Sequence, residues 1–145
     1  MSDRQKLRTV IAIDPGRAKC GVAVVSSAGD VVDRAIVSTS YVGQSVAELA
    51  AEFQPEAIVL GDGTAAKIVE DALDKSAPHL SIHKVDERHT SEQARALYVE
   101  QNPPRGFKKL VPRTLRVPDA PYDDYVAVIL GQRWWNEAER KSGTS

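Results

Sequence analysis

Three short segments rich in valine and isoleucine open the chain, and they restrict its fold more than any other feature. They cover Arg8 to Asp14, Gly21 to Ser26 and Val31 to Ser38, and turn residues such as Ser27 to Asp30 separate them. Strand patterns joined by such short turns predict three consecutive antiparallel strands. Beyond the third segment the pattern changes to one in which helices and strands alternate.

The alternating part of the chain completes an α/β architecture. A helix is predicted over Ser45 to Phe53, where Pro55 ends it. The later pattern predicts a strand at 57–60, a helix after the Gly61–Thr64 turn to about residue 76, a strand at 81–85, helices at 90–100 and 122–139, and an irregular loop at 101–118. This order predicts a five-stranded mixed sheet flanked by helices, as in the ribonuclease H fold.

Size and composition indicate one globular domain, spanning residues 1–145. The chain is 42% hydrophobic and its formal net charge is −1, so any surface that binds nucleic acid must be a local basic patch. Cys20 is the only cysteine and can form no internal disulfide. The sequence shows no charged leader and no apolar run of membrane-spanning length. We therefore expect a cytoplasmic protein that does not enter the membrane.

The first strand ends on a carboxylate, which is an unusual residue for a buried strand. Asp14 precedes a turn that contains Gly16, Arg17 and Lys19. A buried carboxylate needs a counter-charge or a metal ion to replace its lost hydration. Gly16 and Gly21 can adopt backbone angles closed to other residues and let a ligand or neighbouring strand approach closely. The segment predicts a site that handles phosphate; an acidic hairpin turn is the alternative.

Other carboxylates occupy element ends far along the chain. Glu87 follows the last predicted strand, and Asp123 and Asp124 stand in the first turn of the final helix. In the predicted fold they can converge with Asp14. Carboxylates that converge repel one another and are stable together mainly when divalent cations bind between them.

These motifs together resemble one family over nearly the whole chain. The matching segments are Ile13-Asp14-Pro15-Gly16 with Gly21, Val59-Leu60-Gly61, Val85-Asp86-Glu87-Arg88-His89-Thr90 and the helix from Asp123 to Leu130. They are similar to the YqgF family of RuvC-like nucleases in the ribonuclease H superfamily. This chain departs from the pattern at residues 61–64, Gly-Asp-Gly-Thr, where many members have a Leu-Pro turn.

The resemblance implies a two-metal-ion nuclease that uses Mg²⁺ or Mn²⁺. It implies that Asp14, Glu87 and one residue of the final Asp pair bind the metal ions, with Asp14 between them. Alignment of Ala127 four residues downstream selects Asp123, and Asp124 remains the alternative. Two ions about 3.5–4 Å apart activate water and neutralise charge as a phosphodiester is hydrolysed.

Basic side chains are the predicted contacts to nucleic acid. Arg17 and Lys19 flank the first acid, and Arg88 follows Glu87. The loop at 101–118 lacks Asp and Glu and adds five basic residues and a stacking aromatic: Arg105, Lys108, Lys109, Arg113, Arg116 and Phe107. Solvated turns and loops, or pairing of Arg88 with a neighbouring acid, are the alternatives. Residues 61–64 could present backbone amides to phosphate, or form only a turn capped by Thr64.

The remaining candidates have structural interpretations. The histidines His79, His83 and His89 lack the spacing of metal ligands and are expected at the surface or at strand ends. Cys20 is expected to pack in the core. Trp134 and Trp135 cannot share one helical face, so we expect one in the core, while the other is available to a homodimer contact.

Several functions remain open from the sequence. The family resemblance implies either maturation of pre-16S ribosomal RNA or resolution of branched DNA such as Holliday junctions. The Asp-Pro-Gly turn also occurs in actin-like ATPases and kinases, but these bind nucleotide between two related domains and this chain is long enough for one. A non-catalytic nucleic-acid-binding module is a further alternative.

Overall fold

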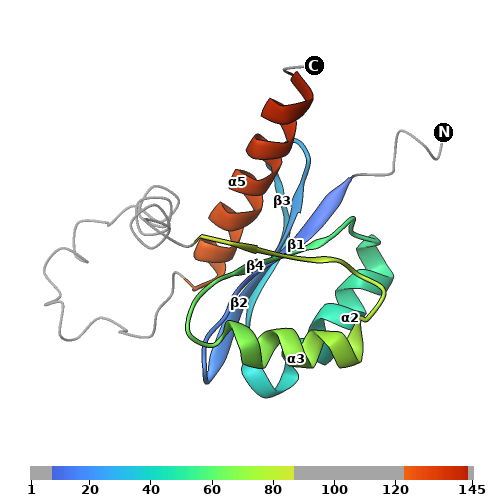
Figure 1. The fold of residues 1–145 in the computed structure, drawn as a ribbon. Coiled ribbons are helices and arrows are strands. Elements are labelled where there is room, and N and C mark those ends of the chain that lie inside the picture. The colour runs from blue at the N-terminus through green and yellow to red at the C-terminus, as the bar shows by residue number, and fades with distance from the viewer. Residues whose placement is uncertain (1–7, 87–122, 144–145) are drawn as a thin grey trace, which may run out of the picture.

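The computed structural model describes residues 8–86 and 123–143, and it forms one mixed sheet with helices on both faces (Figure 1). The strands are β1 (Thr9–Asp14), β2 (Lys19–Ser26), β3 (Val31–Ser38), β4 (Ile58–Gly61) and β5 (Ile82–Val85). The helices are the 3₁₀ turn η1 (Thr39–Tyr41), α2 (Val42–Phe53), α3 (Ala66–Ser76) and α5 (Asp123–Gly143). The predicted α/β fold with five strands is confirmed.

The sheet has the strand order β3-β2-β1-β4-β5. β1 pairs antiparallel with β2, and β2 antiparallel with β3, as the short turns predict. β4 pairs parallel with β1, and β5 parallel with β4, after helical crossovers. The carboxyl ends of β1, β4 and β5 therefore lie at the same edge of the sheet.

The alternation of side chains along β1 separates two hydrophobic cores. Ile11 and Ile13 are fully buried on the face covered by α2 and α3. Val10 and Ala12 are fully buried on the opposite face, against α5. Figure 1 shows the pair of helices on one side of the sheet and α5 on the other. A residue at position 14 consequently belongs to the α5 face.

α5 runs antiparallel to β1 and packs closely on it. A Cβ at Gly131 would lie 2.7 Å from the side chain of Val25, so glycine permits the close approach. The Trp135 indole N–H donates to the Val25 carbonyl over 3.0 Å. Val25 pairs with Val10 near the start of β1, so the last turns of α5 lie there and its first turn lies toward the end of β1. None of the helices in the described ranges is both long and apolar enough to cross a membrane.

Several element boundaries differ from the predicted ones. β2 begins at Lys19 instead of Gly21, because Lys19 still pairs with Ser38 of β3. α2 begins at Val42 instead of Ser45 and follows directly on η1. Thr64 does not cap α3: the cap position is Ala65, which makes no side-chain hydrogen bond to the helix. α5 runs on to residue 143. The helix predicted at 90–100 and the loop at 101–118 lie outside the described residues.

Candidate functional site

Asp14 is the last residue of β1 and stands between two glycines across the sheet. It lies on the α5 face and is half-buried. On β2 its partner is Gly21. On β4 the partner of Ile13 is Leu60, so Gly61 follows at the level of Asp14. Neither glycine carries a side chain, so the two backbone neighbours of Asp14 in the sheet place no side chain beside its carboxylate.

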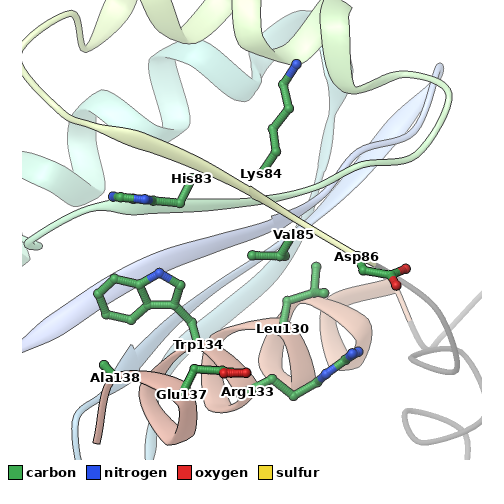
Figure 2. Close-up of a pocket in the computed structure, with 9 residues that line it drawn as sticks. All are labelled: His83, Lys84, Val85, Asp86, Leu130, Arg133, Trp134, Glu137 and Ala138. Carbon is green, nitrogen blue, oxygen red and sulfur yellow. The ribbon is translucent and has the colours of Figure 1, made fainter. Parts of the chain in front are cut away.

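The neighbouring edge strand brings further polar residues toward the same edge. Val85, the last residue of β5, pairs with Gly61, and the exposed Asp86 follows it. Asp86 lines a groove of about 580 Å³ between β5 and α5. In Figure 2, Asp86 lies at one end of this groove, while His83 and Trp134 lie at the other. The predicted ligand Glu87 comes next in the sequence, outside the described residues.

The first residue of α5 is Asp123, so the helix begins with the predicted acidic pair. The side chains of Asp123 and Asp124 are outside the described part. Asp123 stands four residues before Ala127, the spacing that favours it as the metal ligand. Ala127 is fully buried against the sheet as predicted, but Val128, four residues after Asp124, is equally buried. Helical spacing therefore fits both acids and does not select one.

Gly16 is required by crowding within the turn that follows Asp14. A Cβ at this position would lie 2.1 Å from the carbonyl oxygen of Lys19. Gly29, in the turn between β2 and β3, is the single described glycine with a positive φ, at 90°. The prediction that Gly16 and Gly21 supply unusual backbone angles was therefore wrong. Close approach, the second role proposed for Gly16, is correct.

Thr39 holds this turn from η1, and sequence reasoning missed it. Its hydroxyl donates to the Gly16 carbonyl over 2.6 Å, and its backbone N–H donates to the Ala18 carbonyl over 3.0 Å. The Cys20 thiol lies 3.4 Å from the same hydroxyl. Both Thr39 and Cys20 are buried, which confirms the packed position predicted for Cys20. No local signal marks Thr39, because the contact joins segments 23 residues apart.

Two of the predicted basic contacts are described. Arg17 is exposed in the turn beside Asp14, and Lys19 is half-buried as the first residue of β2. Both lie close in the chain to the carboxylate, and their contact with nucleic acid remains a prediction. The other predicted contacts lie outside the described residues: Arg88, Arg105, Phe107, Lys108, Lys109, Arg113 and Arg116.

One backbone amide of the turn at 61–64 is engaged within the protein. The Asp62 N–H donates to the Val85 carbonyl over 3.0 Å, and this bond links β4 to β5 at the edge that carries Asp14. The Gly63 carbonyl accepts from the N–H of Ala66, the first residue of α3, over 3.0 Å. The Asp62 amide is therefore not available to a phosphate, and phosphate binding by the rest of the turn remains a prediction.

The aromatic pair on α5 divides as expected. Trp135 is buried in the core, whereas Trp134 is half-buried and stands 5.9 Å from the ring of the exposed His83. The surface position predicted for His83 is confirmed. Across the described side chains, no three His, Cys, Asp or Glu residues gather into a group that could hold a metal ion. Asp14 is the only predicted metal ligand whose side chain lies in the described part of the chain.

The fold has close counterparts among solved structures. A Thermus thermophilus RuvC bound to a Holliday junction substrate superposes with a TM-score of 0.60 and 17% identity, over 91% of this chain and 96% of that one. A second T. thermophilus RuvC structure gives a TM-score of 0.60 and 15% identity, over 90% and 96% of the two chains. The chain has the RuvC fold. The predicted ribonuclease H-like architecture is thus confirmed. No protein-family model and no curated protein matches the sequence.

Proposed function

We propose that this protein is a divalent-metal-dependent nuclease that hydrolyses phosphodiester bonds in nucleic acid. One observation carries the proposal. On a RuvC-like sheet, Asp14 ends β1 on the face covered by α5, and α5 starts toward this same edge with two aspartates. A half-buried carboxylate at the end of a core strand lowers the stability of the fold unless a counter-charge offsets its lost hydration. Its position between two glycines therefore suits a site that binds cations.

The proposed ligands are Asp14, Glu87 and Asp123, with Asp124 as the alternative to Asp123. Carboxylate oxygens suit Mg²⁺ and Mn²⁺, and the half-buried Asp14 fits such a donor set. Glu87 stands two residues after Val85, the last residue of β5, which packs on the α5 face. When bound, the metal pair would activate water and stabilise the charge of the transition state.

Residues of the turn supply the proposed contacts to the substrate. Arg17 and Lys19 carry positive charge on the segment that follows Asp14. A phosphodiester held there would have its scissile phosphate next to the carboxylates. We propose that the basic residues of the 101–118 segment extend this contact along the backbone of the nucleic acid.

Two substrate classes are proposed. Processing of RNA of the pre-16S 5′-end type is supported by the YqgF-like motifs, in particular the segment from Val85 to Thr90. Cleavage of branched DNA is supported by the likeness to a RuvC solved with a Holliday junction. A resolvase must cut two strands symmetrically, so the second proposal also requires a homodimer.

A cleavage panel tests both proposals. Labelled single-stranded RNA, single-stranded DNA and a four-way DNA junction are incubated with the protein and Mg²⁺ or Mn²⁺. We expect cleavage of the RNA or the junction by the wild type, none by Asp14→Asn, and unchanged cleavage by Asp74→Asn, which alters an exposed carboxylate on α3. Equal cleavage by Asp14→Asn would refute the proposed site. Tight binding without cleavage by the wild type would favour a non-catalytic module.

A further inference from the structure

The turn after Asp14 is held by the buried Thr39, whose hydroxyl makes the shorter of two side-chain contacts to the Gly16 carbonyl; the Cys20 thiol makes the other, over 3.8 Å. Thr39 contacts the turn twice, through its hydroxyl at Gly16 and its backbone N–H at Ala18. These bonds draw both carbonyl groups toward η1 and leave the intervening Arg17 exposed. The conformation in which the turn presents Arg17 therefore depends on a residue that never reaches the surface at the site.

The second basic residue of the segment is anchored in a different way. Lys19 begins β2 and pairs with Ser38 in the ladder between β2 and β3. This backbone pairing does not involve the Thr39 hydroxyl. Loss of that hydroxyl should thus displace Arg17 and leave Lys19 in place, which separates the two residues experimentally.

We propose that Thr39 is a positioning residue for substrate binding: its buried hydroxyl fixes the Gly16 carbonyl and so holds Arg17 where it contacts a phosphate of the nucleic acid. This inference rests on the nuclease function proposed above. Thr39→Val removes the hydroxyl and keeps the shape and β-branch of the side chain, so it leaves the Gly16 carbonyl without this donor. Thr39→Ser retains the hydroxyl and should restore binding.

The test measures KM and kcat with Mn²⁺ on the labelled RNA or four-way junction that the wild type cleaves. Thr39→Val should raise KM about tenfold and leave kcat unchanged, since uniform binding energy is lost. Thr39→Ser should behave as the wild type. Thr9→Val is the matched control, because it removes another buried threonine hydroxyl that donates to a carbonyl, that of Phe53, at the start of β1. Its KM should not change.

Double variants identify the residue through which Thr39 acts. In an Arg17→Ala background, Thr39→Val should have no further effect on KM, whereas in a Lys19→Ala background its full effect should persist. If Thr39→Val fails to fold, Thr39→Ala removes the same hydroxyl, and it should show the same dependence on Arg17.

Three outcomes are distinguishable. An unchanged KM for Thr39→Val, or an equal increase in the presence of Arg17→Ala, would overturn the role of Thr39 and leave the nuclease function intact. A wild type that neither binds nor cleaves the nucleic acids would refute the nuclease function, and this inference with it. An Arg17-dependent rise in KM with rescue by serine supports both.

Discussion

The two faces of the sheet are built differently at the edge where β1 ends. On the face covered by α2 and α3, Ile13 and Leu60 are fully buried within the hydrophobic core. The next residues along the same strands are Asp14 and Gly61, which belong to the opposite face. Hydrophobic packing thus explains Ile13 and Leu60, but it does not explain Asp14, which is the next residue along β1. Under the proposed function, the α5 face carries the chemistry at this edge, and the α2 and α3 face carries the packing.

The largest expected effect comes from neutralising Asp14, the carboxylate at the end of the apolar strand β1. Asp14→Asn should reduce metal-dependent cleavage by on the order of 10³-fold, about 4 kcal/mol of transition-state stabilisation, because a ligand carboxylate is lost. Its melting temperature should equal or exceed that of the wild type. Initial rates with Mn²⁺ and thermal unfolding measure both quantities. A large drop in melting temperature would mean that Asp14 serves the fold.

Substitution of the neighbouring Ile13 should have the opposite effects, a loss of stability without a loss of cleavage. Ile13→Ala creates a cavity on the closed face and should lower the free energy of unfolding by about 3 kcal/mol, as measured by urea denaturation. Cleavage per folded molecule should remain that of the wild type. Loss of activity in the folded fraction would show that the two faces are not independent.

Glycines at the two ends of the α5 face sharpen the comparison. Gly131→Ala should destabilise the protein by about 2 kcal/mol, because its Cβ would meet Val25, and should leave Mn²⁺ affinity unchanged. Gly21→Ala, beside Asp14, should weaken Mn²⁺ binding about tenfold. Calorimetric titration and denaturation of both variants measure the two effects. Equal Mn²⁺ affinity in the two variants would argue against a metal site beside Gly21.

The smallest effect is expected at the closed end of the α5 face. Trp135→Phe keeps an aromatic ring in the core but removes the N–H that donates to Val25. The free energy of unfolding should fall by about 1 kcal/mol, with no change in cleavage. A change in KM or kcat would show that this end of α5 influences the site.

The sequence predicted the elements well and their long-range contacts poorly. The valine- and isoleucine-rich segments identified β1, β2 and β3, because such residues favour strands, and turn residues separated them. The start of α2 lies three residues before the predicted one, and the added turn contains Gly43. In the structure a Cβ at Gly43 would lie 2.5 Å from the Ser76 hydroxyl oxygen, so glycine permits contact between α2 and α3. Such a reason exists only in the folded chain.

In the candidate site too, the sequence indicated a single residue but not the contacts around it. Asp14 stood out from its sequence alone, since a carboxylate at the end of an apolar strand conflicts with burial. Its glycine neighbours across the sheet and the tether from Thr39 depend on strand register and on η1, which no local pattern reports. The choice between Asp123 and Asp124 also needs more than spacing, because Ala127 and Val128 are both buried.

Anomalous diffraction from a crystal grown with Mn²⁺ tests the central claim most directly. We expect a manganese peak at coordination distance from the Asp14 carboxylate, about 2.0–2.2 Å, with Glu87 and one residue of the Asp123–Asp124 pair completing the protein ligands. A crystal saturated with Mn²⁺ that shows no peak at Asp14, or whose manganese is held by other residues, would contradict the account.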